Sequence, residues 1–258
     1  MNHKDIVEHI KNWLSEYAKK ANSNGFVVGI SGGIDSALTS ALCASTGLPT
    51  YCVSMPIKQH ASELNRAHEQ INWLKENFSN VSDIEIDLSD TFDLFKNGLP
   101  QKAQNHPLTM ANTRSRLRMT LLYSLAQPHG YLVAGTGNKV EDFGIGFYTK
   151  YGDGGVDISP IADLMKTEVF ELAEFLNIPN SILSAQPTDG LWDEERTDED
   201  QIGATYSELE WAMEFEGNPE NLDSRQREIL EIYNGFHSRN KHKMTPIPVC
   251  HIPKEYFS

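Results

Sequence analysis

Residues 26–36 read FVVGISGGIDS, and this stretch decides the fold class. The apolar run at 26–30 is typical of a buried strand. Gly32 and Gly33 follow it, and glycine lets a backbone turn tightly and approach a ligand closely. After the turn, apolar residues recur at helical spacing over 38–45, which predicts a helix. A strand, a glycine turn and a helix in this order begin a βαβ unit.

The rest of the chain continues this alternation of strands and helices. Strands are predicted at 26–30, 50–55, 84–88 and 131–134. Helices are predicted at 4–21, 38–45, 64–78, 108–127, 166–176, 205–215 and 224–240. The alternation predicts an α/β fold: a doubly wound parallel sheet of about five strands, Rossmann-like, with helices on both faces. Ligands bind such sheets beyond the carboxyl ends of the strands, so we expect the loops at 31–36 and 135–142 to form the site.

The composition excludes several classes of protein. The chain has 258 residues, with 36 acidic and 22 basic side chains and a net charge of −14. This charge disfavours a nucleic-acid partner held by a general basic surface. The cysteines (Cys43, Cys52 and Cys250) are odd in number and far apart, which disfavours a disulfide framework. No apolar run approaches the roughly 18 residues that span a bilayer. We expect a single domain over 1–258, cytoplasmic, with reduced thiols and no membrane partner.

The segment SGGIDS at 31–36 has the features of a phosphate-binding turn. The helix after it begins with free N–H groups and the positive end of its dipole. Ser31 and Ser36 add hydroxyl donors. Asp35 would repel a bare phosphate, so its placement suggests a bridging Mg²⁺ ion. No lysine follows the glycines as in GxxxxGK[ST], and the alternative is an ordinary turn capped by Ser and Asp.

This segment resembles the pyrophosphate loop of the N-type ATP pyrophosphatases. Members of that superfamily split ATP into AMP and pyrophosphate while they activate a carboxylate or carbonyl for attack by nitrogen or sulfur. The loop alone does not choose among the NAD, GMP and asparagine synthetases and the tRNA-modifying enzymes.

A second motif makes the choice. Residues 147–160 read FYTKYGDGGVDISP, which resembles the NAD synthetase signature FxTKYGDGGxDIxP. Further matches lie at 135–141 (GTGNKVE), Lys166, 187–188, 190–192, 197–200 and 242–243. The resemblance covers nearly the whole chain in the expected order, and on it the chain is identified as a member of the NAD synthetase family.

The resemblance implies roles for residues that match the family's motifs. ATP would be bound by Gly29, Ile30, Ser31, Gly32, Gly33, Ile34, Asp35, Ser36, Thr136, Lys166 and Thr188. Mg²⁺ would be held by Asp35 and Glu141. Deamido-NAD would be bound by Arg116, Lys150, Asp157, His242 and Lys243. No covalent nucleophile is expected. Arg114 and Arg118 are either a solvated face or further anion contacts, and the roles of Asn138 and Lys139 stay open.

The resemblance also implies the reaction: ammonia amidates deamido-NAD at the expense of ATP, through a carboxylate-adenylate, in the last step of NAD biosynthesis. A glutaminase domain would need roughly 150 or more further residues. The synthetase motifs already run from residue 29 to 243, so we expect free ammonia as the nitrogen donor. A homodimer is implied as well, with the helices at 108–127 and 205–240 as candidate interface material.

Two other functions remain possible at this point. A sulfur- or lysine-transferring tRNA enzyme is disfavoured by the negative charge and by the lack of a CxxC pair. A non-catalytic nucleotide sensor on the same sheet would bind ATP and release no pyrophosphate. The stretch at 186–200 is polar and acidic. Its acidic run at 193–200 is a solvated loop by default, or, as the family resemblance implies, a segment that orders over bound nucleotides.

Overall fold

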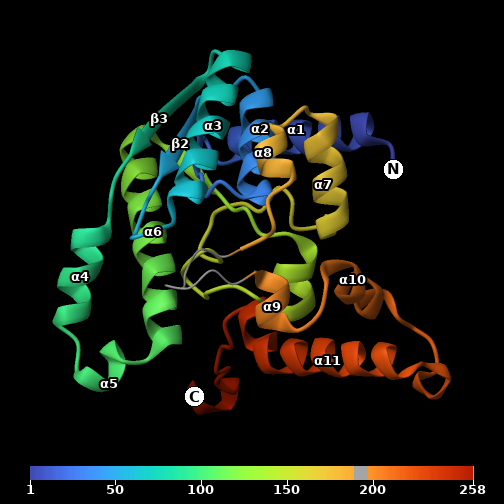
Figure 1. The fold of residues 1–258 in the computed structure, drawn as a ribbon. Helices are drawn as coiled ribbons and strands as arrows, with labels where there is room; N and C mark the ends of the chain where they lie inside the picture. Colours follow the sequence, from blue (N-terminus) through green and yellow to red (C-terminus); the bar gives the residue numbers. More distant parts are fainter. Residues whose placement is uncertain (189–196, 258) are drawn as a thin grey trace.

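The computed structural model describes residues 1–188 and 197–257 (Figure 1). Its centre is a parallel sheet of four strands in the order β3-β2-β1-β4. The strands are β1 (Gly25–Gly29), β2 (Thr50–Ser54), β3 (Val81–Glu85) and β4 (Tyr131–Ala134). The chain runs outward from β1 to β3 and then returns to place β4 on the other side of β1. The boundary between β1 and β4 is therefore the switch point where ligands bind in such sheets.

The predicted α/β architecture is confirmed, with four strands in the described residues rather than about five. Ile158 lies where the next strand would be, and it forms a single parallel bridge with Ala134. Pro160 follows two residues later and lacks the N–H that a ladder needs. The third strand begins at Val81, earlier than predicted. Its hydrogen bonding to the neighbouring segment continues to Leu88, whose N–H donates to Pro56 O.

Helices cover both faces of the sheet. On one side lie α1 (His3–Lys20), α2 (Ile34–Ser45), α3 (Ala61–Asn77), α7 (Lys166–Phe175) and α8 (Asn180–Leu183). On the other side lie α4 (Ser89–Asn97), α5 (Gln101–Gln104) and α6 (Pro107–His129). Successive side chains of a strand point to opposite faces. Phe26 and Val28 accordingly pack with the first group, whereas Val27 packs against α6.

A third apolar cluster lies beyond the carboxyl edge of the sheet. It joins α10 (Tyr206–Glu214) and α11 (Ser224–Met244) to a π-helical segment, η1 (Val140–Ile145), which follows β4. His237 and Asn240 of α11 bond to the Gly144 and Ile145 carbonyls of η1. The remaining short elements are α9 (Asp198–Ile202), η2 (Pro219–Asn221) and η3 (Lys254–Phe257). Because η1 carries Glu141, this cluster supports one side of the predicted site.

Two sequence expectations concern residues outside this description. The motif residues 190–192 and most of the stretch 186–200 lie outside the described ranges. Within those ranges, every helix is too short or too polar to cross a lipid bilayer.

Candidate active site

The loop between β1 and α2 has the shape of an anion-binding turn. Gly32 adopts φ +84, and a Cβ atom there would lie 2.4 Å from the Glu63 carbonyl oxygen of α3, so only glycine fits. Gly33 begins α2 without a side-chain cap on the first N–H groups of the helix. Ser31 and Ser36 are hydrogen-bonded to each other within the turn. The turn thus presents uncapped N–H groups and two hydroxyls toward the carboxyl end of the sheet.

One cavity at the β1–β4 boundary is lined by every residue expected to bind ATP, including Thr136, Lys166 and Thr188. Glu141 lines it too. The cavity also has arginines that the motifs did not single out for ATP. Arg66 donates its Nε to Gly32 O, and Arg118 donates its Nε to Met55 O. These guanidinium groups add positive charge to walls that also carry several carboxylates.

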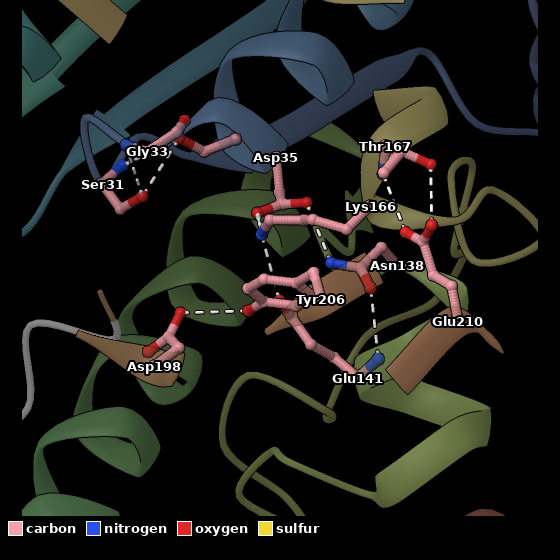
Figure 2. A network of polar contacts seen from close by, with 11 residues as sticks. Ser31, Gly33, Asp35, Asn138, Glu141, Lys166, Thr167, Asp198, Tyr206 and Glu210 are labelled. Carbon is pink, nitrogen blue, oxygen red and sulfur yellow. Dashed lines mark hydrogen bonds and ion pairs between the residues drawn. The ribbon is translucent and has the colours of Figure 1, made fainter. Parts of the chain in front are cut away.

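The centre of the cavity holds a buried ion cluster (Figure 2). The Lys166 ammonium contacts Asp35 Oδ2 on α2 and Glu141 Oε1 on η1, the latter at 3.0 Å. Lys166 is only 2% exposed. We call Asp35 and Glu141 the acid pair. Their carboxylates reach one cation from opposite loops, so the structure brings both predicted metal ligands together.

Asn138 is fully buried between the two acids of this pair. Its Nδ2 donates to Asp35 Oδ1 at 3.1 Å, and its Oδ1 accepts the Glu141 N–H at 3.1 Å. The Asn138 side chain therefore joins the loop at residues 31–36, which we call the phosphate loop, to the loop after β4. The sequence left the role of Asn138 open, and the structure places it against both residues of the acid pair.

Helix α10 supports the same centre from below (Figure 2). The Tyr206 hydroxyl donates to Glu141 Oε1 at 2.6 Å and lies 3.2 Å from Asp198 Oδ2. Glu210 accepts both the N–H and the hydroxyl of Thr167, at 2.9 and 2.8 Å. A lysine at the start of a helix opposes the helix dipole. At the start of α7, Lys166 is stabilised instead by the carboxylates around it.

Burial and charge together set the ionisation of this cluster. Burial raises the pKa of Asp35 above its ordinary value, and Lys166 offsets this rise only in part. Burial acts in the same direction on Glu141, but Lys166 and hydrogen bonds from Tyr206 and Asn138 bring its pKa below the ordinary value. Burial would lower the pKa of Lys166, yet the two carboxylates outweigh it and raise that pKa. The lysine is therefore cationic at neutral pH.

A third acid, Asp142, lies beside the pair. Burial, together with the negative charge of Glu141, raises the pKa of Asp142 to about 8. Its carboxylate lies against the backbone of Gly137, where a Cβ atom would be 2.3 Å from a carboxylate oxygen. Because Gly137 has no side chain, the Asp142 carboxylate can occupy this space.

The acid pair fits a hard divalent cation. Two carboxylate oxygens converge on one positive group, which is the type of donor that Mg²⁺ prefers. Among the described residues no group of three or more His, Cys, Asp and Glu side chains could hold a metal ion. Further ligands would therefore come from water or from the oxygens of a phosphate group bound on the neighbouring 31–36 loop.

Four of the five residues expected to bind deamido-NAD form a second cluster. Arg116 on α6 donates to Lys150 O at 3.2 Å, and the Lys150 ammonium donates to His242 O at 2.9 Å. Lys243 donates to the carbonyls of Gly146 and Tyr148. Hydrogen bonds from cationic side chains to backbone carbonyls thereby join three segments that are far apart in the sequence, namely α6, the 146–155 loop and the end of α11. His242 takes part through its backbone carbonyl.

Asp157, the fifth residue, does not join this cluster. Its carboxylate accepts the Val133 N–H at 2.8 Å and the Tyr123 hydroxyl at 3.0 Å. It therefore lies beside β4 and α6, and it does not line the cavity of the phosphate loop.

The three arginines of α6 point in different directions. The Arg114 guanidinium packs 4.5 Å from the Phe92 ring centroid and is buried, so it is neither a solvated side chain nor an anion contact of this cavity. Arg118 lines the cavity, whereas Arg116 contacts the 146–155 loop. Side chains two positions apart on a helix project about 200° from each other, so Arg116 points away from the side of α6 that carries Arg114 and Arg118. Arg114 and Arg118 are about one turn apart on that side and therefore reach Phe92 and the cavity respectively.

Sequence reasoning missed Arg66, Tyr206 and Glu210. A capping box between Thr205 and Glu208 signals where α10 begins. No local pattern, however, indicates that the first residue of that helix reaches Glu141, because the contact spans 65 residues of sequence.

Comparison with known proteins places this site in a family context. A family model described as NAD synthase matches residues 6–246. The NH(3)-dependent NAD(+) synthetase of Mesoplasma florum is 38% identical over 239 residues, which cover 92% of this chain and 94% of the relative. The solved NMN synthetase of Francisella tularensis is 33% identical with a TM-score of 0.85, and the match covers 98% and 99% of the two chains. An NH3-dependent NAD synthetase from Campylobacter jejuni, 26% identical, matches with a TM-score of 0.78 over 97% and 100%.

Proposed function

Because this chain belongs to the NAD synthase family, we propose that it is a ligase that amidates deamido-NAD with ammonia at the expense of ATP. The products are NAD, AMP and pyrophosphate, and the reaction is the last step of NAD biosynthesis. The observation that carries the proposal is that the uncapped 31–36 loop, the acid pair and Lys166 all line one cavity.

ATP would lie with its phosphates on the 31–36 loop. The N–H groups at the start of α2 and the Ser31 and Ser36 hydroxyls are donors of the type that phosphate oxygens accept. Lys166, Thr136 and Thr188 line the same cavity and would contact the nucleotide. Asp35 and Glu141 would hold Mg²⁺. When bound, the ion would neutralise charge on the phosphate oxygens of the leaving pyrophosphate.

In the first step the nicotinate carboxylate of deamido-NAD attacks the α-phosphorus of ATP. Pyrophosphate leaves from the 31–36 loop, where the N–H groups of α2 stabilise its charge. The remaining carboxylate-adenylate is then attacked at its carbonyl carbon by ammonia, and AMP leaves. Holding the two nucleotides in line supplies much of the rate enhancement, so no covalent nucleophile is required.

Deamido-NAD would be bound by the cluster of Arg116, Lys150, His242 and Lys243. The dinucleotide is anionic at its phosphates, and this cluster gathers three cations from three segments. Asp157 would contact a different part of the same substrate, since it lies beside β4 and outside this cluster.

We propose free ammonia as the nitrogen donor and a single synthetase domain over the chain. The Mesoplasma florum relative, named as NH(3)-dependent, is matched over 94% of its own length. A glutamine substitution assay tests the donor: glutamine in place of ammonium should give no NAD.

A homodimer is the proposed assembly. Side chains on the α6 side of the sheet remain only partly buried in one copy, among them Leu117, Leu121 and Leu125. Leu94 and Leu108 nearby are exposed at 78% and 52%. A second copy would cover these apolar side chains. Sedimentation at micromolar protein should give twice the chain mass, and a monomer would reject this assembly.

The free thiols of Cys43, Cys52 and Cys250 accord with the cytoplasmic location that we also propose.

A second candidate function is the amidation of nicotinate mononucleotide to NMN. The observation in its favour is the match to the solved NMN synthetase of Francisella tularensis, with a TM-score of 0.85. Both substrates carry the same nicotinate carboxylate, so the chemistry above would be unchanged. They differ only in the adenylate half that the dinucleotide adds.

One experiment tests both candidates. Purified protein is mixed with ATP, Mg²⁺ and ammonium, together with either deamido-NAD or nicotinate mononucleotide. NAD or NMN, AMP and pyrophosphate are then measured. The larger kcat/KM identifies the substrate, and release of ADP in place of AMP would reject both candidates.

A further inference from the structure

Each carboxylate of the acid pair accepts a hydrogen bond from a neutral side chain in addition to its contact with Lys166. Asn138 donates its amide N–H to Asp35, and Tyr206 donates its hydroxyl to Glu141 (Figure 2). Asn138 is fully buried and Tyr206 is 5% exposed. A buried donor that loses its acceptor is costly, so these two bonds fix where the carboxylate oxygens lie.

The two donors come from different parts of the fold. Asn138 lies between β4 and η1, and its amide oxygen also accepts the Glu141 N–H. Asn138 therefore fixes the backbone at Glu141 and the side chain of Asp35. Tyr206 begins α10, which is held to the start of α7 by the bonds from Thr167 to Glu210. The acid pair is thus set between two rigid supports.

The neutrality of both donors suits a site that must accept a cation. A second lysine or arginine at either position would occupy the charge of the pair and compete with an incoming metal ion. An amide and a phenol orient the carboxylates and leave their negative charge available. Such outer hydrogen bonds commonly change metal affinity by about 10- to 100-fold.

We propose that Asn138 and Tyr206 are positioning residues that hold Asp35 and Glu141 at the separation a divalent cation needs. The inference rests on the proposed function, since it is that reaction which calls for the cation. Neither residue touches the reacting atoms in this account; each acts through one carboxylate.

The test uses Tyr206→Phe and Asn138→Ala in the full chain. Tyr206→Phe keeps the ring that lies 4.7 Å from the Lys166 ammonium and removes only the hydroxyl. Binding of Mn²⁺ is measured by electron paramagnetic resonance in the presence of α,β-methylene ATP, which cannot turn over at the α-phosphorus. We expect each variant to bind Mn²⁺ about tenfold more weakly. The Mg²⁺ concentration for half-maximal activity should rise similarly, with kcat of Tyr206→Phe recovered at saturating Mg²⁺.

Matched controls separate positioning from packing. Tyr131→Phe alters a tyrosine that stacks on His129 at the opposite end of β4. Asn80→Ala removes an amide that donates to the backbone carbonyls of Ala44 and Leu48. Both controls should keep the parent Mn²⁺ affinity, even where thermal stability falls. A folded Tyr206→Phe variant with parent-like Mn²⁺ affinity and Mg²⁺ dependence would overturn the inference. Parent protein that makes neither NAD nor NMN would instead overturn the proposed function, and the Mn²⁺ titration would still decide the positioning roles.

Discussion

Lys166 and Asp35 are 131 residues apart in the sequence, yet the buried Lys166 ammonium forms an ion pair with the partly buried Asp35 carboxylate at the carboxyl end of the sheet. The pair joins the start of α7 to the phosphate loop. Because Glu141 contacts the same ammonium, one cation holds together the β1 loop, the β4 loop and α7. Two carboxylates therefore share one ammonium group at the centre of the cavity.

Lys166→Met should destabilise the protein. The substitution leaves two buried carboxylates without their shared cation, and breaking a buried pair in this way costs about 3–5 kcal/mol. Urea unfolding at pH 7 measures the change. Asp35→Asn added to Lys166→Met should recover part of the loss, because it removes one of the two unpaired charges. A double variant no more stable than Lys166→Met would contradict this explanation.

Asp35→Asn alone should abolish turnover while the fold stays intact. The amide keeps the shape of the side chain but loses the charge proposed to hold the metal ion, and we expect kcat to fall at least about 100-fold. Pyrophosphate release reports the activity, and thermal unfolding checks the fold. Unchanged activity would refute the metal assignment.

Arg118→Gln and Arg116→Gln should each weaken the binding of a different substrate. Arg118 lines the cavity with the phosphate loop, whereas Arg116 lies with Lys150. A hydrogen bond to a charged group contributes about 1.5–3 kcal/mol, which corresponds to roughly 10- to 100-fold in affinity. The KM for ATP should rise in Arg118→Gln, and the KM for deamido-NAD should rise in Arg116→Gln. The same KM changing in both variants would mean that the arginines serve one ligand.

Lys150→Ala should weaken the binding of deamido-NAD more than that of ATP. We expect the KM for deamido-NAD to rise by about tenfold or more. Lys75→Ala is a suitable control, because Lys75 forms an exposed ion pair with Asp83 far from the cluster. Steady-state kinetics with each substrate varied in turn gives both constants. Equal losses for the two substrates would place Lys150 elsewhere in the mechanism.

Asp142→Asn should change how stability depends on pH. The pKa of Asp142 is raised from 3.8 to about 8 in the folded protein. Between these values the unfolded chain releases a proton that the folded chain keeps, so the free energy of unfolding falls as pH rises from about 4 to about 8. The variant should lack this loss, and therefore be more stable than the parent at pH 8 and similar to it at pH 4. Thermal unfolding across this range is the measurement, and a parent as stable as the variant at pH 8 would contradict the raised pKa.

Much of the fold followed from local patterns. The apolar run before Ser31 and the helical spacing after it predicted β1 and α2, and the later alternation predicted a parallel sheet with helices on both faces. The patterns predicted the ends of individual strands less accurately. The third strand was predicted at 84–88 but begins at Val81, because pairing with β2 rather than local apolar alternation sets its register.

The α/β class, the glycine turn and the family could all be predicted from local patterns, since these depend on backbone conformation and on motifs along the chain. The three-dimensional fold was needed to show that Lys166 contacts Asp35 and Glu141, that Asn138 and Tyr206 bond to them, and that Arg118 rather than Arg116 faces the phosphate loop. Local patterns reflect interactions between residues a few positions apart, whereas a buried charge selects its partners through space and must find them wherever the fold brings them.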